Sequence, residues 1–167
     1  MPRCLPLAAC CLALILAGCA PATIQNYKAK STEEGQIVSQ LVKIPNGLKA
    51  KNVELMMQPY ADDVFVANFS KYLGVAGPTA PLSISKPELR TAYGQILRSV
   101  NEISMDVKDP RFTVTGDRAT VEATTELLFQ QQRGRKEAKQ GDIYRNEVIW
   151  RLKRTPVGWR IFEEVWQ

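Results

Sequence analysis

The spacing of apolar residues changes once along the chain, near Glu102, and no other feature of the sequence limits the fold so strongly. Before this point apolar residues recur at helical spacing, and after it they alternate with polar residues, which is typical of strands. The clearest helical stripe is Leu89, Ala92, Tyr93, Ile96, Leu97 and Val100. The clearest alternation is Ala119, Val121, Ala123, Thr125, Leu127 and Phe129. Helices followed by a run of strands predict an α+β domain that ends in an antiparallel meander.

Serine and asparagine residues mark where the helices are expected to begin. The segments Ser31–Glu34 and Ser85–Glu88 each fit a capping box, in which the serine and glutamate side chains satisfy free amides of the first turn. The helix from Ser31 is expected to kink at Pro45, because proline lacks the amide that a helix interior needs. A second, short helix is expected after Asn52.

The expected strands follow from the alternation and from the turn residues between them. A turn over 60–63 leads into a strand over 64–69, and a loop follows over 71–84. After residue 102, strands are expected over 102–114, 119–129, 142–154 and 159–166, with turns at 116–117 and 155–158 and a polar hairpin tip over 131–141.

Cysteine and histidine usage limits the chemistry of the chain. All four cysteines, Cys4, Cys10, Cys11 and Cys19, lie in the first 19 residues, and there is no histidine. The rest of the chain therefore has no disulfide framework, no Cys–His zinc site and no imidazole base. We expect no metal and no cofactor.

The first 20 residues have the pattern of a signal peptide. Arg3 is followed by an apolar run from Cys4 to Ala20 that is too short, and too interrupted by Pro6 and Gly18, for a lasting membrane span. The run ends in Leu16-Ala17-Gly18-Cys19, which resembles the lipobox of bacterial lipoproteins. The alternative is an ordinary cleaved signal peptide in which Cys19 has no role.

The lipobox resemblance implies a processed and anchored chain. Residues 1–18 would be removed as a lipoprotein signal peptide, and the Cys19 thiolate and the new amino group would carry fatty-acyl chains of the palmitate type. Residues 19–30 would form the lipidated anchor and tether, and residues 31–167 one folded domain. Ala20 follows the cysteine, which implies the outer membrane, facing the periplasm, in preference to the inner membrane.

Further motifs resemble one superfamily of α+β domains. They are Asn52 and Met56 in one helix, the segment Tyr60-Ala61-Asp62-Asp63, and the closing strands with Trp150-Arg151-Leu152 and Gly158-Trp159-Arg160-Ile161. Together they resemble the nuclear-transport-factor-2-like (NTF2-like, SnoaL-like) superfamily over about residues 31–166. The resemblance implies an NTF2-like cone, in which N-terminal helices pack on a curved antiparallel sheet and leave a pocket at the wide end. Such domains include isomerases, dehydratases, hydrolases and pure binding proteins, so the fold does not assign the function. The aspartate–histidine pair of the dehydratase type cannot be carried over without a histidine.

Six residues are candidates for lining a pocket: Tyr60, Asp63, Tyr93, Tyr144, Asn146 and Glu163. Asp63, beside Asp62, could act as a general base in a pocket. Alternatively, it could be a turn residue whose carboxylate forms hydrogen bonds with the local backbone. Tyr144 and Asn146 share a strand face with Val148, Trp150 and Leu152. On the neighbouring strand, Glu163 would share a face with Ile161 and Val165. A phenol, an amide and a carboxylate among apolar side chains could orient a small ligand. The alternatives are cross-strand ion pairs of Glu163 or Glu164 with Arg145 or Arg160, and core packing for Tyr60 and Tyr93.

The hairpin tip carries the densest positive charge of the chain. Arg133, Arg135, Lys136 and Lys139 stand against Glu137 alone. This basic patch fits contact with anionic lipid or an acidic partner, or else a solvated hairpin tip. Nucleic acid is not expected, because no aromatic residues interleave the cluster.

The sequence therefore predicts a membrane-anchored envelope lipoprotein with a binding or protein-interaction role in the periplasm. Its expected partners are the lipid bilayer, through acylated Cys19, and an envelope protein or a small apolar ligand. Catalysis is the less favoured expectation. Two alternatives stay open: an isomerase-like or hydrolase-like enzyme that uses Asp63 or Glu163 as a base, and a subunit of an envelope assembly or secretion machine.

Overall fold

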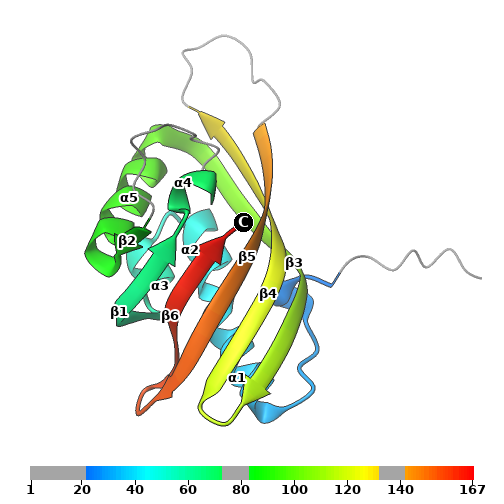
Figure 1. Ribbon diagram of the computed structural model, residues 1–167. Helices are drawn as coiled ribbons and strands as arrows, with labels where there is room; N and C mark the ends of the chain where they lie inside the picture. Colours follow the sequence, from blue (N-terminus) through cyan, green and yellow to red (C-terminus); the bar gives the residue numbers. More distant parts are fainter. Residues whose placement is uncertain (1–21, 73–82, 132–141) are drawn as a thin grey trace, which may run out of the picture.

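The computed structural model describes residues 22–72, 83–131 and 142–167 (Figure 1). Cys19 lies outside the described residues, and so do all four residues of the basic patch. No helix in the described ranges is long and apolar enough to cross a bilayer.

The helices are η1 (Ile24–Asn26), α1 (Thr32–Leu41), α2 (Lys43–Lys49), α3 (Val53–Met57), α4 (Phe69–Tyr72) and α5 (Lys86–Ser99). Three of them, α1, α3 and α5, begin directly after Ser31, Asn52 and Ser85, as the capping residues predict. Ser31 Oγ accepts from the Glu34 amide at 3.1 Å, and the Ser85 amide donates to Glu88 Oε2 at 2.7 Å. The expected kink is a break between α1 and α2 at Val42, and Pro45 lies in the first turn of α2, where its missing amide costs little.

One sheet of six strands follows the order β2-β1-β6-β5-β4-β3. The strands are β1 (Tyr60–Ala67), β2 (Ser83–Ser85), β3 (Val100–Thr115), β4 (Arg118–Gln131), β5 (Asp142–Thr155) and β6 (Gly158–Trp166). The last four form the predicted antiparallel meander, while β1 pairs in parallel with β6. The turn expected over 60–63 is wrong: Asp62 and Asp63 lie within β1, because pairing with the distant strand β6 already begins at Tyr60.

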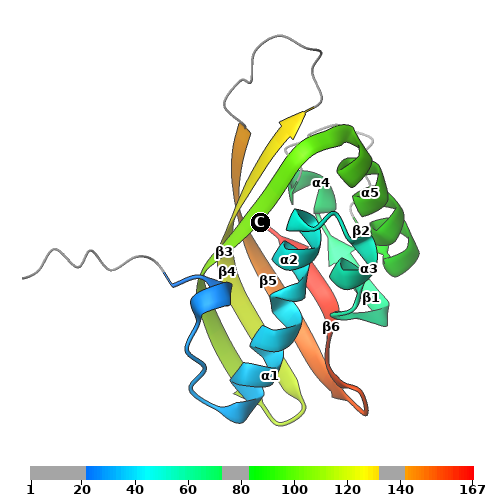
Figure 2. The same ribbon diagram turned by 180° about the vertical axis from the view of Figure 1, so that it is seen from behind.

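The helices lie on one face of the curved sheet and enclose the core there. Figure 2 shows α1, α2 and α3 crossing this face, which we call the inner face. The core between these layers includes all three tryptophans, Trp150, Trp159 and Trp166. This arrangement confirms the predicted α+β architecture.

A β-bulge in β6 reverses the face on which its last residues lie. Leu152 pairs with Ile161, but Arg151 pairs with Glu163, so Phe162 is an extra residue in β6. Beyond the bulge Glu164 is buried on the inner face, and Glu163 lies on the outer face. The expectation that Glu163 shares a face with Ile161 is therefore wrong, because one inserted residue shifts the alternation by one position.

Residues 22–27, which we call the docked segment, pack along the outer edge of β3. Ile24 is fully buried, and Thr23 forms a bridge with Lys108. The Asp109 amide donates to the Ala22 carbonyl at 2.8 Å, at a β-bulge that leaves this amide turned away from β4. The sequence suggests a spacer here because these residues have no period, but the described chain is packed against β3 from Ala22 onward.

Candidate functional site

A surface recess of about 500 Å³ opens beside the start of β1. We call it the charged recess. Its walls come from α3, the first residues of β1, the first turn of α5 and the β5–β6 turn, and Figure 1 shows these elements at one end of the sheet. Its lining residues are Glu54, Met57, Gln58, Tyr60, Ala61, Asp62, Asp63, Lys86, Arg90, Lys153, Thr155, Val157 and Arg160.

Ion pairs neutralise all three carboxylates that line the charged recess. Lys86 Nζ lies 2.8 Å from Asp62 Oδ1, and Lys153 Nζ lies 2.6 Å from Asp63 Oδ2. Arg90 reaches Glu54 at 3.3 Å. Lys86 also donates to the carbonyl of Tyr60 at 2.8 Å, which fixes the ammonium between strand and carboxylate.

Arg160 is the fourth cation of the charged recess, and it has no carboxylate within salt-bridge distance among the described residues. Its Nη1 donates to the neighbouring Trp159 carbonyl at 2.8 Å. A guanidinium carries five N–H donors, so this contact leaves most of its donor capacity for other groups. The charged recess thus has four cations against three anions, and its excess positive charge can be assigned to Arg160.

The two aspartates are poorly suited to act as bases. The hydrogen bond from Lys153 holds the pKa of Asp63 below its ordinary value, and the hydrogen bond from Lys86 does the same for the pKa of Asp62. A carboxylate with a lowered pKa accepts a proton less readily than a free one. Their positions favour charge pairing over proton transfer.

Glu164 is a second chemical feature, on the inner face close to the charged recess. Its side chain is fully buried and accepts three hydrogen bonds, from the Tyr60 hydroxyl at 2.8 Å and from the indole nitrogens of Trp150 and Trp166 at 2.7 Å each. Burial raises the pKa of Glu164, and the three hydrogen bonds oppose that effect. Tyr60 links the two features, because it also lines the charged recess.

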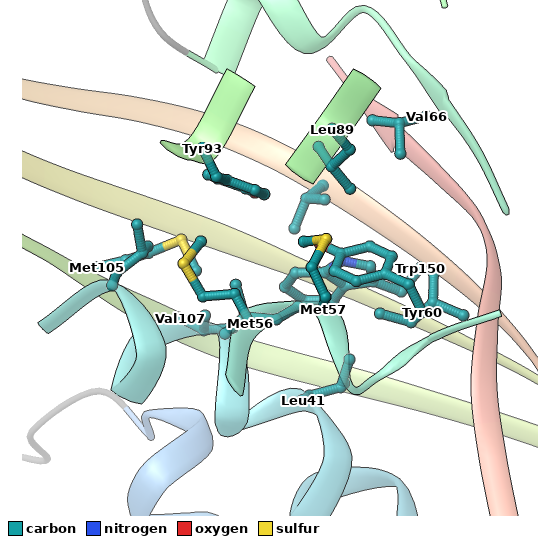
Figure 3. Close-up of a cluster of buried hydrophobic side chains, with 14 of the residues drawn as sticks. Leu41, Met56, Met57, Tyr60, Val66, Leu89, Tyr93, Met105, Val107 and Trp150 are labelled. Carbon is teal, nitrogen blue, oxygen red and sulfur yellow. The ribbon is translucent and has the colours of Figure 1, made fainter. Parts of the chain in front are cut away.

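Side chains fill the space between the helices and the inner face. Figure 3 shows Met56, Met57 and Met105 beside Tyr93 and Trp150, from elements on both sides of this space. All five are buried. The superfamily pocket expected from the sequence would lie on this side of the sheet, and here methionine and aromatic side chains occupy it.

The structure does not gather the six predicted pocket residues into one site. Tyr60 and Asp63 line the charged recess. Tyr93 is buried in the core, where its ring packs edge-on against Phe69 at 5.4 Å. The remaining three are on the sheet, and they are Tyr144, Asn146 and Glu163.

Tyr144 and Asn146 lie on the inner face of the sheet, and Glu163 lies on the outer face. Tyr144 packs against the core, and its predicted place on one strand face with Val148 and Trp150 is confirmed. Glu163 pairs with Arg151 at 2.6 Å on the outer face, so the cross-strand ion pair weighed from the sequence exists, with a different arginine.

Sequence reasoning missed the two most distinctive side chains of this region. The sequence indicates Arg160 and Glu164 only as possible partners in cross-strand ion pairs. The spacing of Trp150, Trp166 and Tyr60 contains no local signal for Glu164, because the three donors meet only through non-local strand pairing. In the described parts of the chain no group of acidic side chains could hold a metal ion.

Comparison with known proteins shows the fold. No protein-family profile matches the sequence, and no curated protein matches it. A candidate aromatic ring hydroxylase from Novosphingobium aromaticivorans has a TM-score of 0.68 at 10% identity, covering 84% of this chain and 91% of that chain. A candidate dehydratase of the NTF2-like family from Streptomyces avermitilis has a TM-score of 0.61 at 17% identity, covering 79% and 92%. An NTF2-like protein with a cystatin-like fold, also from N. aromaticivorans, has a TM-score of 0.63 at 15% identity, covering 80% of each chain.

The chain therefore has the NTF2-like α+β fold that its sequence predicted. At these identities the likeness extends to the fold and assigns no reaction to this chain.

Proposed function

We propose that this chain is a lipid-anchored protein of the bacterial envelope whose NTF2-like domain binds an acidic group of an envelope partner in the charged recess. The observation that carries the binding role is Arg160, a cation in a recess whose three carboxylates are already paired. A carboxylate from a partner would complete the charge balance, and Arg favours planar, two-point contacts with such groups.

The anchor is supported by the sequence Leu16-Ala17-Gly18-Cys19 at the end of an apolar run. With acyl chains on Cys19, the domain would face the periplasm from the outer membrane. Two lipid signals already hold a protein stably on a bilayer, so several acyl chains on one residue would make the attachment lasting.

A protein partner suits the charged recess better than a small apolar ligand does. The recess is lined by seven charged side chains. At its rim Val157 is an exposed apolar side chain, at 72%. Arginine is enriched in protein interfaces, and the centre of an interface is largely apolar. The proposed partner segment therefore pairs an acidic residue with an apolar one.

Binding is favoured over catalysis for two physical reasons. The recess aspartates have pKa values lowered by lysine contacts, and Glu164 is enclosed by three donors away from solvent. An enzyme of this fold remains the second candidate, because Tyr60 contacts Glu164 and also lines the recess, which joins a buried acid to the surface. Turnover of a small substrate that is lost in Tyr60→Phe would favour this candidate.

The binding role can be tested with a labelled peptide that contains glutamate and leucine residues. Arg160→Gln should weaken binding about 10-fold or more, since a charge-assisted hydrogen bond contributes about 1.5–3 kcal/mol. Arg98→Gln is the matched control, because Arg98 is an exposed arginine at the other end of α5, away from the recess residues. Equal loss in both variants, or no loss in Arg160→Gln, would contradict the assignment. Recovery of a stable stoichiometric complex from envelopes would indicate a subunit of a larger assembly.

The anchor is tested separately. Cys19→Ser should abolish metabolic labelling by a fatty acid and release the protein into the soluble periplasmic fraction. A Cys19→Ser protein that remains membrane-bound at full length would show that the anchor assignment is wrong.

A further inference from the structure

The docked segment joins the folded domain to the residue proposed to carry the lipid. Its backbone is fixed to β3 at two successive positions, by the Thr23–Lys108 bridge and by the hydrogen bond from the Asp109 amide to the Ala22 carbonyl. Ile24 inserts into the core and is fully buried. The segment is therefore part of the domain from its first described residue.

Further contacts hold the segment beyond Ile24. The Thr23 amide donates to Asn26 Oδ1 at 2.7 Å, which closes the short helix η1. The Tyr27 ring lies 4.7 Å from the Phe112 ring, and its hydroxyl donates to Glu34 at 3.3 Å. Undocking would expose Ile24 and the edge of β3 together, so the segment does not serve as a free tether.

The length of chain left between lipid and domain is therefore small. Only residues 20 and 21 separate Cys19 from Ala22. Three Cα–Cα steps reach at most about 11 Å, whereas a free tether to Ser31 would reach about 40 Å. The head-group layer alone takes up roughly 5–8 Å of this reach on each side of the bilayer.

We propose that the anchor holds the β3 edge of the sheet against the bilayer surface and turns the β2 edge toward the periplasm. This inference rests on the proposed acylation of Cys19. The two edges lie five strand spacings apart, about 24 Å. The charged recess lies on the β1 and α5 side of the fold, so this orientation presents it to partners in the periplasm.

Geometry, more than charge, sets this orientation. On β3, Lys108 pairs with Glu126 and Arg111 pairs with Glu122, while Asp106 and Asp109 are exposed. Lys28 and Lys30, just after the docked segment, are also exposed. A mixed surface of this kind has no strong attraction to anionic lipid. The orientation should therefore persist when salt is raised.

The chain offers a clean labelling experiment, because all its cysteines lie within residues 4–19 and an acylated Cys19 has no free thiol. Full-length Gln25→Cys and Gln95→Cys form a matched pair of exposed glutamine positions, one in the docked segment and one in α5. Each lipidated protein is labelled with a fluorophore and reconstituted into phosphatidylethanolamine and phosphatidylglycerol vesicles that contain a lipid with a nitroxide on its head group. Quenching should be several-fold stronger at residue 25 than at residue 95, at low and high salt.

A lengthened tether supplies the decisive comparison. A Gly-Ser segment of about 12 residues, with a mean span of about 20 Å, is inserted between residues 21 and 22 of both variants. The quenching at residue 25 should then fall to the level at residue 95. Equal quenching of the two sites without the insertion, or quenching at residue 25 that the insertion leaves unchanged, would overturn the orientation. The intact mass separates the two proposals: a lipidated chain with the wrong quenching pattern overturns only the orientation, and a chain without lipid on Cys19 overturns both.

Discussion

The Trp150 indole donates a hydrogen bond to Glu164 Oε2 at 2.7 Å, across a directly paired position of β5 and β6 where both side chains are buried. Tyr60 donates to the same oxygen, and Trp166 donates to the other. All three neighbours are donors in these contacts, so the site requires a side chain with two acceptor oxygens. A carboxyl group has two such oxygens, and an amide has only one.

We therefore predict that changes at Glu164 destabilise the fold strongly. Glu164→Ala should lower the free energy of unfolding by about 3–5 kcal/mol, because it leaves buried donors without an acceptor. Glu164→Gln should cost about 1–3 kcal/mol, since its NH₂ group must face one of the donors. Urea unfolding followed by tryptophan fluorescence gives both values.

Glu163→Gln is the control for this pair. Glu163 is the adjacent carboxylate, but it lies on the outer face and pairs with Arg151. Its replacement should change the free energy of unfolding by about 1 kcal/mol or less. Similar losses at positions 163 and 164 would show that the three hydrogen bonds to Glu164 do not stabilise the fold as argued.

The raised pKa of Glu164 predicts how stability changes with pH. A folded-state pKa above the ordinary value of 4.5 means that the folded protein binds this proton more tightly than the unfolded chain. The contribution of Glu164 to the free energy of unfolding is therefore fully present below pH 4.5 and is lost as the pH rises through the folded-state pKa. The stability of the wild type relative to Glu164→Gln should therefore fall as the pH rises above 4.5.

Asp63→Asn should show the opposite dependence. The Lys153 contact lowers the pKa of Asp63, so its contribution is present above the ordinary value of 3.8 and is lost as pH falls through the folded-state pKa. Unfolding curves of the wild type, Glu164→Gln and Asp63→Asn, measured at pH values both below 3.8 and above 4.5, separate the two effects. A difference between wild type and Glu164→Gln that stays constant or grows with rising pH would contradict the assigned shift.

Local signals in the sequence predicted much of the fold. The capping residues Ser31 and Ser85 located two helices, and the alternation after Glu102 located the meander. These signals are carried by neighbours in the sequence, because caps and strand faces depend on residues a few positions apart. The resemblance to NTF2-like domains then predicted helices packed on a curved sheet.

The candidate site was less predictable because it depends on contacts between distant residues. The parallel pairing of β1 with β6 places Asp63 beside Lys153, which is 90 positions away. The bulge at Phe162 buries Glu164 and turns Glu163 to the outer face, and an alternating pattern contains no sign of one inserted residue. Ile24 stands alone among polar neighbours, so periodicity does not show that it is buried.

Gly47 allows α2 and α3 to approach each other closely. A Cβ at this position would lie 2.9 Å from the Met56 amide nitrogen and 3.0 Å from the Asn52 carbonyl oxygen. Both atoms belong to the backbone, so α3 would have to shift. Gly47→Ala should therefore lower the free energy of unfolding by about 1–3 kcal/mol.

Gly94→Ala is the matched control within α5. The nearest atom to its added Cβ would be Arg98 Nη1 at 3.7 Å, an ordinary contact. In a helix interior, alanine is favoured over glycine by about 0.5–1 kcal/mol, so this variant should be slightly more stable than the wild type. Thermal unfolding gives the comparison, and a Gly47→Ala protein as stable as Gly94→Ala would show that the helices have room to move.

Ile24 should make the docked segment necessary for full stability. Because its side chain is fully buried, Ile24→Ala should lower the free energy of unfolding by about 2–4 kcal/mol. A fragment of residues 31–167 should be destabilised at least as much relative to residues 22–167, since it also uncovers the edge of β3. Gln25→Ala, an exposed neighbour, should stay within about 0.5 kcal/mol of the wild type. Urea midpoints measured on these four soluble proteins give the comparison. Equal midpoints for the longer and shorter fragments would mean that residues 22–30 act as a free tether, and the orientation proposed for the anchored domain would lose its basis.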